Sequence, residues 1–201
     1  MTPTLFLLCV LAAFAELDTT YAFQLTFSRG IIIAPLFSLL TGDVMAGIQV
    51  GVFTELLFAD VNPLGGILPP SAVVCSAVTL AVHYAGAALY LAFLFGVITA
   101  ILFAIAEKYR RRLRFRWLIY WEQKIIKKPR KVNRAVCVSL LASVIINFLL
   151  LFVAIFIGSY AVVWLGSVLP GQAQTACKLA YLAVPWIGLA ALIPEFRLKT
   201  R

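Results

Sequence analysis

The 201-residue sequence is poor in charged residues and has a single histidine, His83. Charged side chains make up 12% of the chain, whereas a soluble domain of this size carries about a quarter. A lone histidine leaves little scope for metal chemistry or for a histidine-based proton relay. The sequence also lacks a glycine-rich phosphate loop, an H-E-x-x-H motif and a Ser/His/Asp arrangement. We therefore expect no catalytic motif, no metal site and no cofactor.

Cysteine is equally sparse. The four cysteines are widely separated and form no C-x-x-C pair: Cys9, Cys75, Cys137 and Cys177. Free cysteine in an apolar run behaves as a small hydrophobic residue. We therefore expect buried thiols here, and neither a metal site nor a disulfide framework.

Hydrophobic residues, by contrast, make up 63% of the chain, and its mean hydropathy is +1.02. A soluble domain is nearer half apolar, so the surplus apolar surface is available to lipid and to helix partners. The sequence therefore predicts an all-α integral membrane protein with several transmembrane helices. We expect a single membrane domain over residues 1–201.

The basic residues are concentrated in one block. The net charge is +9, and 12 of the 17 Lys and Arg residues lie between Lys108 and Arg134. Such a block between two apolar runs is typical of a cytoplasmic loop under the positive-inside rule, so residues 107–134 and the basic tail 195–201 are predicted to be cytoplasmic. Aromatic residues at helical spacing indicate an amphipathic helix on the membrane surface, where anionic lipid headgroups would bind. This placement favours membrane lipids, and not nucleic acid, as partners.

The first half of the chain contains short apolar runs. Residues 3–15 are predicted to form a retained first helix and not a cleaved signal peptide, because no Lys or Arg precedes the run. Residues 30–41 and 44–59 are each short for a span and are joined at Gly42-Asp43. This pattern predicts either a tight helical hairpin or a re-entrant element.

Longer runs follow. Residues 71–106 exceed one span, so they form either a strongly tilted helix or one broken near His83–Gly86, and the helix is expected to end at Glu107. The remaining expected elements are a helix over 135–165, a polar loop over Gly166–Lys178 and a last helix over 179–193 interrupted by Pro185.

Four residues recur at every fourth position in the second run of the pair: Asp43, Gly47, Gly51 and Glu55. On a helix this spacing places them along one slowly drifting stripe. The glycines match the small-xxx-small pattern of helix packing, and they would also let a ligand approach closely. Glu55 lies inside an apolar run, so it is either protonated or paired. Asp43 is expected to be the N-cap of the following helix.

Two further polar residues are candidates for a site. Asn62 precedes a proline, so it either stabilises an ordinary turn or contacts sugar hydroxyls. His83 is expected to pack between helices with its hydrogen bonds satisfied, and not to bind a ligand. Carboxylates, an asparagine and small residues around a broken helix suit a neutral polyhydroxylated solute, because a carboxylate accepts two hydroxyls at once.

Several of these residues occur in a familiar order: Phe27-Ser28-Arg29, Gly42-Asp43, Gly51-Val-Phe-Thr-Glu55, then Asn62 in a proline-containing turn. In this order and spacing, residues 23–85 resemble the N-terminal half of the IIC subunit of mannose/sorbose-family phosphotransferase systems (PTS). In that family an arginine after an aromatic residue opens a run that ends in Gly-Asp. A Gly-x-x-x-Glu or Gly-Gly-x-x-Glu segment and an asparagine turn follow.

The resemblance implies a permease subunit of the bacterial inner membrane. Such a subunit carries a hexose-type sugar that a soluble IIB protein phosphorylates, within an oligomeric complex that includes a IID-like membrane subunit and soluble IIA and IIB phosphocarriers. It has no catalysis of its own. Carried over by position, Glu55 and Asn62 are substrate-binding candidates, with Gly51 providing clearance and Asp43 shaping the hinge.

Three features depart from the family pattern. The chain ends soon after residue 193, where family members continue, and its central block is more basic. Asn62 lies one position off the family's register relative to Glu55. These departures leave open an alternative function, that of a non-transporting, IIC-like membrane anchor or regulatory subunit that recruits soluble carriers through its basic loop.

Overall fold

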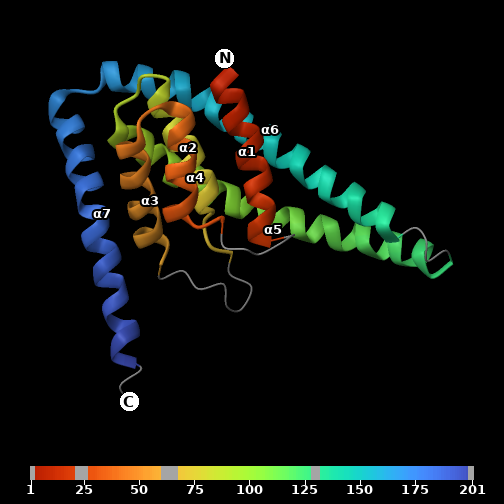
Figure 1. Ribbon diagram of the computed structural model, residues 1–201. Coiled ribbons are helices and arrows are strands. Elements are labelled where there is room, and N and C mark those ends of the chain that lie inside the picture. The colour runs from red at the N-terminus through yellow and green to blue at the C-terminus, as the bar shows by residue number, and fades with distance from the viewer. Residues whose placement is uncertain (1–2, 21–26, 60–67, 128–131, 199–201) are drawn as a thin grey trace.

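The computed structural model describes residues 3–20, 27–59, 68–127 and 132–198, which form seven α-helices and no strand (Figure 1). In chain order the helices are α1 Pro3–Thr20, α2 Gly30–Thr41, α3 Val44–Phe58, α4 Ala72–Tyr84, α5 Leu89–Lys127, α6 Val132–Val168 and α7 Gly171–Leu198. Three segments of these helices are long and apolar enough to cross a membrane: Leu89–Trp117, Ala135–Val168 and Gly171–Ile193. The predicted all-α membrane class is confirmed.

Helix α4 lies at the centre of the bundle. All residues from Val73 to Val82 are buried, and the helix packs against α1, α2, α3, α5 and α6. A helix that is apolar all round needs neighbours on every side. The Ser71 hydroxyl caps its N-terminus by accepting the backbone N–H of Val74 over 3.2 Å.

Helix α1 is part of the same bundle. It buries Leu8 and Ala12 and packs against α4 and α6. The expected first helix is therefore present, and its retention in the mature protein stays a prediction.

Two glycines end helices and create the predicted breaks. Gly42, between α2 and α3, has φ 84°, and Gly86, between α4 and α5, has φ 105°. Glycine adopts this left-handed conformation without the steric cost that a Cβ would bring. The Gly42 N–H donates to the carbonyl of Ser38 over 2.8 Å and closes the end of α2. Of the alternatives that the sequence left open, the structure therefore shows a tight helical hairpin for α2–α3 and a break near residues 83–86.

The predicted end of the long helix at Glu107 was wrong, because α5 continues to Lys127. The sequence has no Gly or Pro between Val97 and Lys128, and Arg, Lys and Leu are good helix formers. Glu107 also pairs with Arg110 and Arg111, three and four positions further along the same helix. Residues 108–127 of the basic block therefore extend α5 and do not form a separate helix, while the cytoplasmic placement of the block stays a prediction.

The predicted polar loop over Gly166–Lys178 was also wrong, because only two residues separate α6 from α7. A polar side chain of this segment instead forms hydrogen bonds with the end of α6. The Gln174 side-chain nitrogen donates to the carbonyls of Gly166 and Leu169 over 3.0 and 3.1 Å, which satisfies acceptors that the end of α6 leaves unpaired. Helix α7 then continues through Pro185 without interruption.

The four thiols are free, but they are not all buried. Cys9 and Cys75 are buried as expected, Cys177 is half-buried, and Cys137 is exposed. The expectation was wrong for Cys137, which lies between two exposed valines, Val136 and Val138, on α6.

Candidate functional site

The two glycines of the predicted stripe, Gly47 and Gly51, are buried where α3 packs against α2. A Cβ on Gly51 would lie 2.8 Å from the carbonyl oxygen of Gly30, and a Cβ on Gly47 would overlap the side chain of Ser38. Helix packing therefore accounts for the small-residue pattern. The space beside Gly51 is occupied by α2.

Glu55 lies near the end of α3 and pairs with Arg29, which precedes the first residue of α2. Nη1 of Arg29 donates to Oε1 of Glu55 over 2.8 Å, and the two side chains are 64% and 28% exposed, respectively. Oε2 of Glu55 has no partner among the residues that the structure describes. Of the two states expected for Glu55, the paired one is observed. The pair presents a carboxylate acceptor and guanidinium donors at one end of the hairpin.

Asp43 lies at the other end of α3, in the hairpin turn, and it is the predicted N-cap. Its Oδ1 accepts the N–H of Ala46 over 3.0 Å, and this hydrogen bond holds the pKa of Asp43 below its ordinary value. Its Oδ2 lies 3.4 Å from Nε2 of His83, whose Nδ1 lies 2.8 Å from the carbonyl oxygen of Ala87. Both ring nitrogens therefore face acceptors. The contact links the α2–α3 turn to the α4–α5 break.

The structure does not bring the two carboxylates of the stripe together. Asp43 and Glu55 are twelve positions apart on one helix, which corresponds to about 18 Å along its axis. A single monosaccharide cannot contact both. Gly51 lies one turn from Glu55, and Asn62, the remaining predicted site residue, lies outside the described residues.

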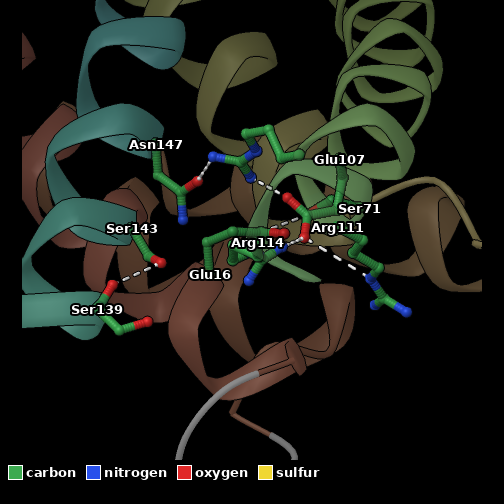
Figure 2. Close-up of polar contacts among 9 residues, drawn as sticks. Glu16, Ser71, Glu107, Arg111, Arg114, Ser139, Ser143 and Asn147 are labelled. Carbon is green, nitrogen blue, oxygen red and sulfur yellow. Dashed lines mark hydrogen bonds and ion pairs between the residues drawn. The ribbon is translucent and has the colours of Figure 1, made fainter. Parts of the chain in front are cut away.

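A second polar region lies between α5 and α6 (Figure 2). Glu107 accepts hydrogen bonds from Arg110 and Arg114, and its Oε1 lies 3.7 Å from Nε of Arg111. Nη1 of Arg110 donates in turn to Oδ1 of Asn147 on α6 over 2.6 Å. Glu107 and Asn147 are both buried. One buried carboxylate thus meets three guanidinium groups.

The same region includes a link between α1 and α4. The Ser71 hydroxyl donates to Oε2 of Glu16 over 2.6 Å, and both residues are buried. Figure 2 shows this pair beside the Glu107 group. The polar contacts therefore link α5 to α6 and, separately, α1 to the N-terminus of α4. Among the described residues, no group of three or more His, Cys, Asp or Glu side chains could hold a metal ion.

Sequence reasoning missed both Arg29 as the partner of Glu55 and the Glu107 group. A signal for the first was present, since Arg29 is the one Lys or Arg residue before Lys108 and a lone acid in an apolar run needs a counter-ion. A signal for the second was the spacing of Glu107 to Arg110 and Arg114, which places all three on neighbouring turns of one helix.

Comparisons with known proteins add to this geometry. A family model described as "PTS system sorbose-specific IIC component" matches residues 3–197. A solved structure described as "Structure of membrane protein" is similar in fold, with a TM-score of 0.65 and 18% sequence identity, over 98% of this chain and 85% of that chain. At this identity the likeness concerns the fold alone. No curated protein sequence matches the chain.

Proposed function

The chain belongs to the family of PTS sorbose-specific IIC components, and from this premise we propose that it carries a hexose-type sugar across the bacterial inner membrane. Membership of this family makes the chain a membrane permease subunit of a sugar PTS, which is a transport component and not an enzyme in its own right. In the proposal, a soluble IIB partner phosphorylates the sugar as it reaches the cytoplasmic face.

The proposed complex contains a IID-like membrane subunit and soluble IIA and IIB phosphocarriers. We place the basic segment 107–134 and the C-terminal tail in the cytoplasm, where those carriers act. This placement follows the positive-inside rule, since 12 of the 17 basic residues lie between Lys108 and Arg134.

The observation that carries the proposed sugar site is the Arg29–Glu55 pair. A carboxylate accepts hydrogen bonds from two adjacent hydroxyls of a sugar, and a guanidinium donates to hydroxyl and ring oxygens. Oε2 of Glu55 has no partner within the described part of the chain, so a sugar could bind it without breaking the ion pair.

The other predicted site residues have different roles in this proposal. Gly51 allows the close approach of α2 to α3, which brings Arg29 within reach of Glu55. Asp43 shapes the hinge at the far end of the hairpin. Asn62 is proposed as a further sugar contact from its place in the family pattern.

Sugar uptake in cells that express the chain with its PTS partners tests the proposal, with labelled sorbose, mannose, fructose and glucose as probes. Glu55→Gln removes the charge but keeps the shape of the side chain. A hydrogen bond to a charged group is worth about 1.5–3 kcal/mol, so we expect uptake at low sugar concentration to fall about tenfold or more.

Asp18→Asn on α1 is the matched carboxylate-to-amide control. Oδ2 of Asp18 accepts the Ser28 N–H over 3.3 Å, and an amide oxygen accepts it equally well, so uptake should stay near wild type. Normal uptake by Glu55→Gln would exclude a sugar contact at Glu55. If the wild-type chain and its partners move none of the four sugars, the non-transporting alternative is favoured.

A further inference from the structure

The last turn of α3, which includes Glu55, is fixed by contacts with other parts of the chain. Glu55 pairs with Arg29, immediately before α2. The neighbouring Thr54 hydroxyl donates to Sγ of Cys75 on α4 over 3.8 Å, and both residues are fully buried. A Cβ on Gly30, the first residue of α2, would lie 3.2 Å from Cβ of Thr54. The start of α2 and helix α4 therefore hold two consecutive residues of this turn.

The next residue of the turn, Leu56, faces α7. A Cβ on Gly188 of α7 would lie 2.6 Å from the carbonyl oxygen of Leu56 and 2.7 Å from its carbonyl carbon. Because these are backbone atoms, they cannot rotate aside as the end of a long side chain can, so this approach requires glycine. Leu56 follows Glu55 directly in the helix, so a shift of the Leu56 backbone also moves Glu55.

Helix α7 lies at the edge of the bundle and packs mainly against α3 and α5 (Figure 1). Two turns before Gly188, the ring of Tyr181 lies 4.8 Å from that of Phe53 on α3 and 5.2 Å from that of Phe93 on α5. The Tyr181 hydroxyl is buried and has no hydrogen-bond partner among the described residues. The ring therefore makes this contact, and residues 181 and 188 lie on the same face of α7.

We propose that α7 regulates the proposed sugar site by setting the position of Glu55 through the contact between Gly188 and Leu56. Gly188 is a positioning residue, which does not touch the sugar and acts through the last turn of α3. While α7 packs against Leu56, Glu55 is held within reach of Arg29 and its carboxylate is oriented for the sugar. When α7 moves away, the turn loses one of its supports and the affinity for the sugar falls.

This control suits a carrier, which must bind its sugar on one side of the membrane and release it on the other. Residues Gly171–Ile193 of α7 are long and apolar enough to cross the membrane, so one candidate span directly contacts the turn that carries Glu55. A ligand favours the conformation that binds it more tightly, so sugar binding in turn favours the packed position of α7. The inference rests on the proposed sugar site and adds the element that regulates it.

Gly188→Ala tests the contact by two measurements on the full-length chain. In purified protein in detergent, amide hydrogen exchange at residues 54–58 should become about fivefold faster or more, because overpacking destabilises the contact. Exchange at residues 44–47, at the other end of α3, should stay as in wild type. In cells with the PTS partners, the KM for the transported sugar should rise about fivefold or more, while the maximal rate changes less than about twofold.

Gly166→Ala on α6 is the matched control, since a Cβ there meets only Cδ1 of Leu91, at the ordinary contact distance of 3.4 Å. A second variant, Tyr181→Leu, loosens α7 from Phe53 without overpacking and loses no hydrogen bond among the described residues. It should change the exchange and the KM in the same direction, and it tests the proposal even if Gly188→Ala does not fold.

The double variant Gly188→Ala, Glu55→Gln separates positioning from general damage. If Gly188 acts through Glu55, the KM of the double variant should be within about twofold of that of Glu55→Gln alone. Multiplied losses would overturn the proposal, as would unchanged exchange at residues 54–58 in both α7 variants. Faster exchange with an unchanged KM would overturn it where Glu55→Gln itself raises the KM. Where Glu55→Gln leaves the KM unchanged, the sugar site fails, and the control by α7 fails with it.

Discussion

The glycines of α3 bring two helices together more closely than any larger residue allows. Gly47 faces the Ser38 side chain, and Gly51 faces the backbone of Gly30. This close approach places the ends of α2 and α3 so that Arg29 reaches Glu55. The spacing of the glycines could be predicted from the sequence, but the identity of the surface they face could not.

Gly47→Ala should destabilise the hairpin, because the added Cβ would overlap Cβ and Oγ of Ser38. Overpacking of this kind costs about 1–3 kcal/mol, which detergent-based unfolding would measure. The double variant Gly47→Ala, Ser38→Gly should recover most of the loss. Gly171→Ala is the control, since a Cβ there has no neighbour within 4 Å. Equal stability of Gly47→Ala and wild type would contradict this packing.

Glu107→Gln should be strongly destabilising, because it removes the one carboxylate that three arginines share. Removing one partner of a buried ion pair costs about 3–5 kcal/mol. Lys108→Gln changes an exposed neighbour on the same helix and should shift the unfolding free energy by less than about 0.5 kcal/mol. Similar unfolding curves for the two variants would show that Glu107 is not needed to hold the arginines.

At the level of helices, the breaks could be predicted from local residue types, whereas the ends of the long helices could not. A glycine with positive φ interrupts the chain at residues 42 and 86. The basic block after Glu107 looked like a loop because charge usually marks the membrane surface. Helix α5 continues into it as far as Lys127, and Glu107 pairs with the first arginines of the block, Arg110 and Arg111.

Asp43→Ala should loosen the first turn of α3, because it removes both the cap to Ala46 and the contact with His83. An N-cap is worth about 1 kcal/mol, so amide hydrogen exchange at residues 44–47 should become about fivefold faster. Asp43→Asn keeps a capping oxygen and should exchange nearly as slowly as wild type. Equally fast exchange in both variants would show that the charge of Asp43, and not the cap, holds this turn.

The stability of the same turn should depend on pH. The Ala46 hydrogen bond lowers the pKa of Asp43 in the folded state, so its stabilising effect is present above the ordinary aspartate range. The effect is lost as the pH falls through the lowered pKa. Exchange measured at neutral and at strongly acidic pH, with Asp43→Asn as reference, would reveal this dependence.

For the whole molecule, the three spanning segments and the basic residues define an expected orientation. Helices α6 and α7 are separated by only two residues, and these lie at the opposite end of α6 from its junction with the basic block. The α6–α7 connection and the basic block should therefore lie on opposite sides of the membrane.

Reporter fusions in cells test that orientation. A fusion after Lys127 and one after Arg201 should report the cytoplasm, because both follow basic segments. A fusion after Leu169 should report the outer side. The same side for all three positions would contradict a membrane crossing by α6 and α7.

The sequence by itself determined the membrane class, the Asp43 cap and the family resemblance, and it limited residues 30–59 to a helical hairpin or a re-entrant element. These properties depend on composition and on neighbouring residues. Only the tertiary structure decided that Glu55 meets Arg29 and that Arg110 reaches Asn147. The paired residues are 26 and 37 positions apart, so their contacts depend on where helices break and how they pack. No local pattern contains that information.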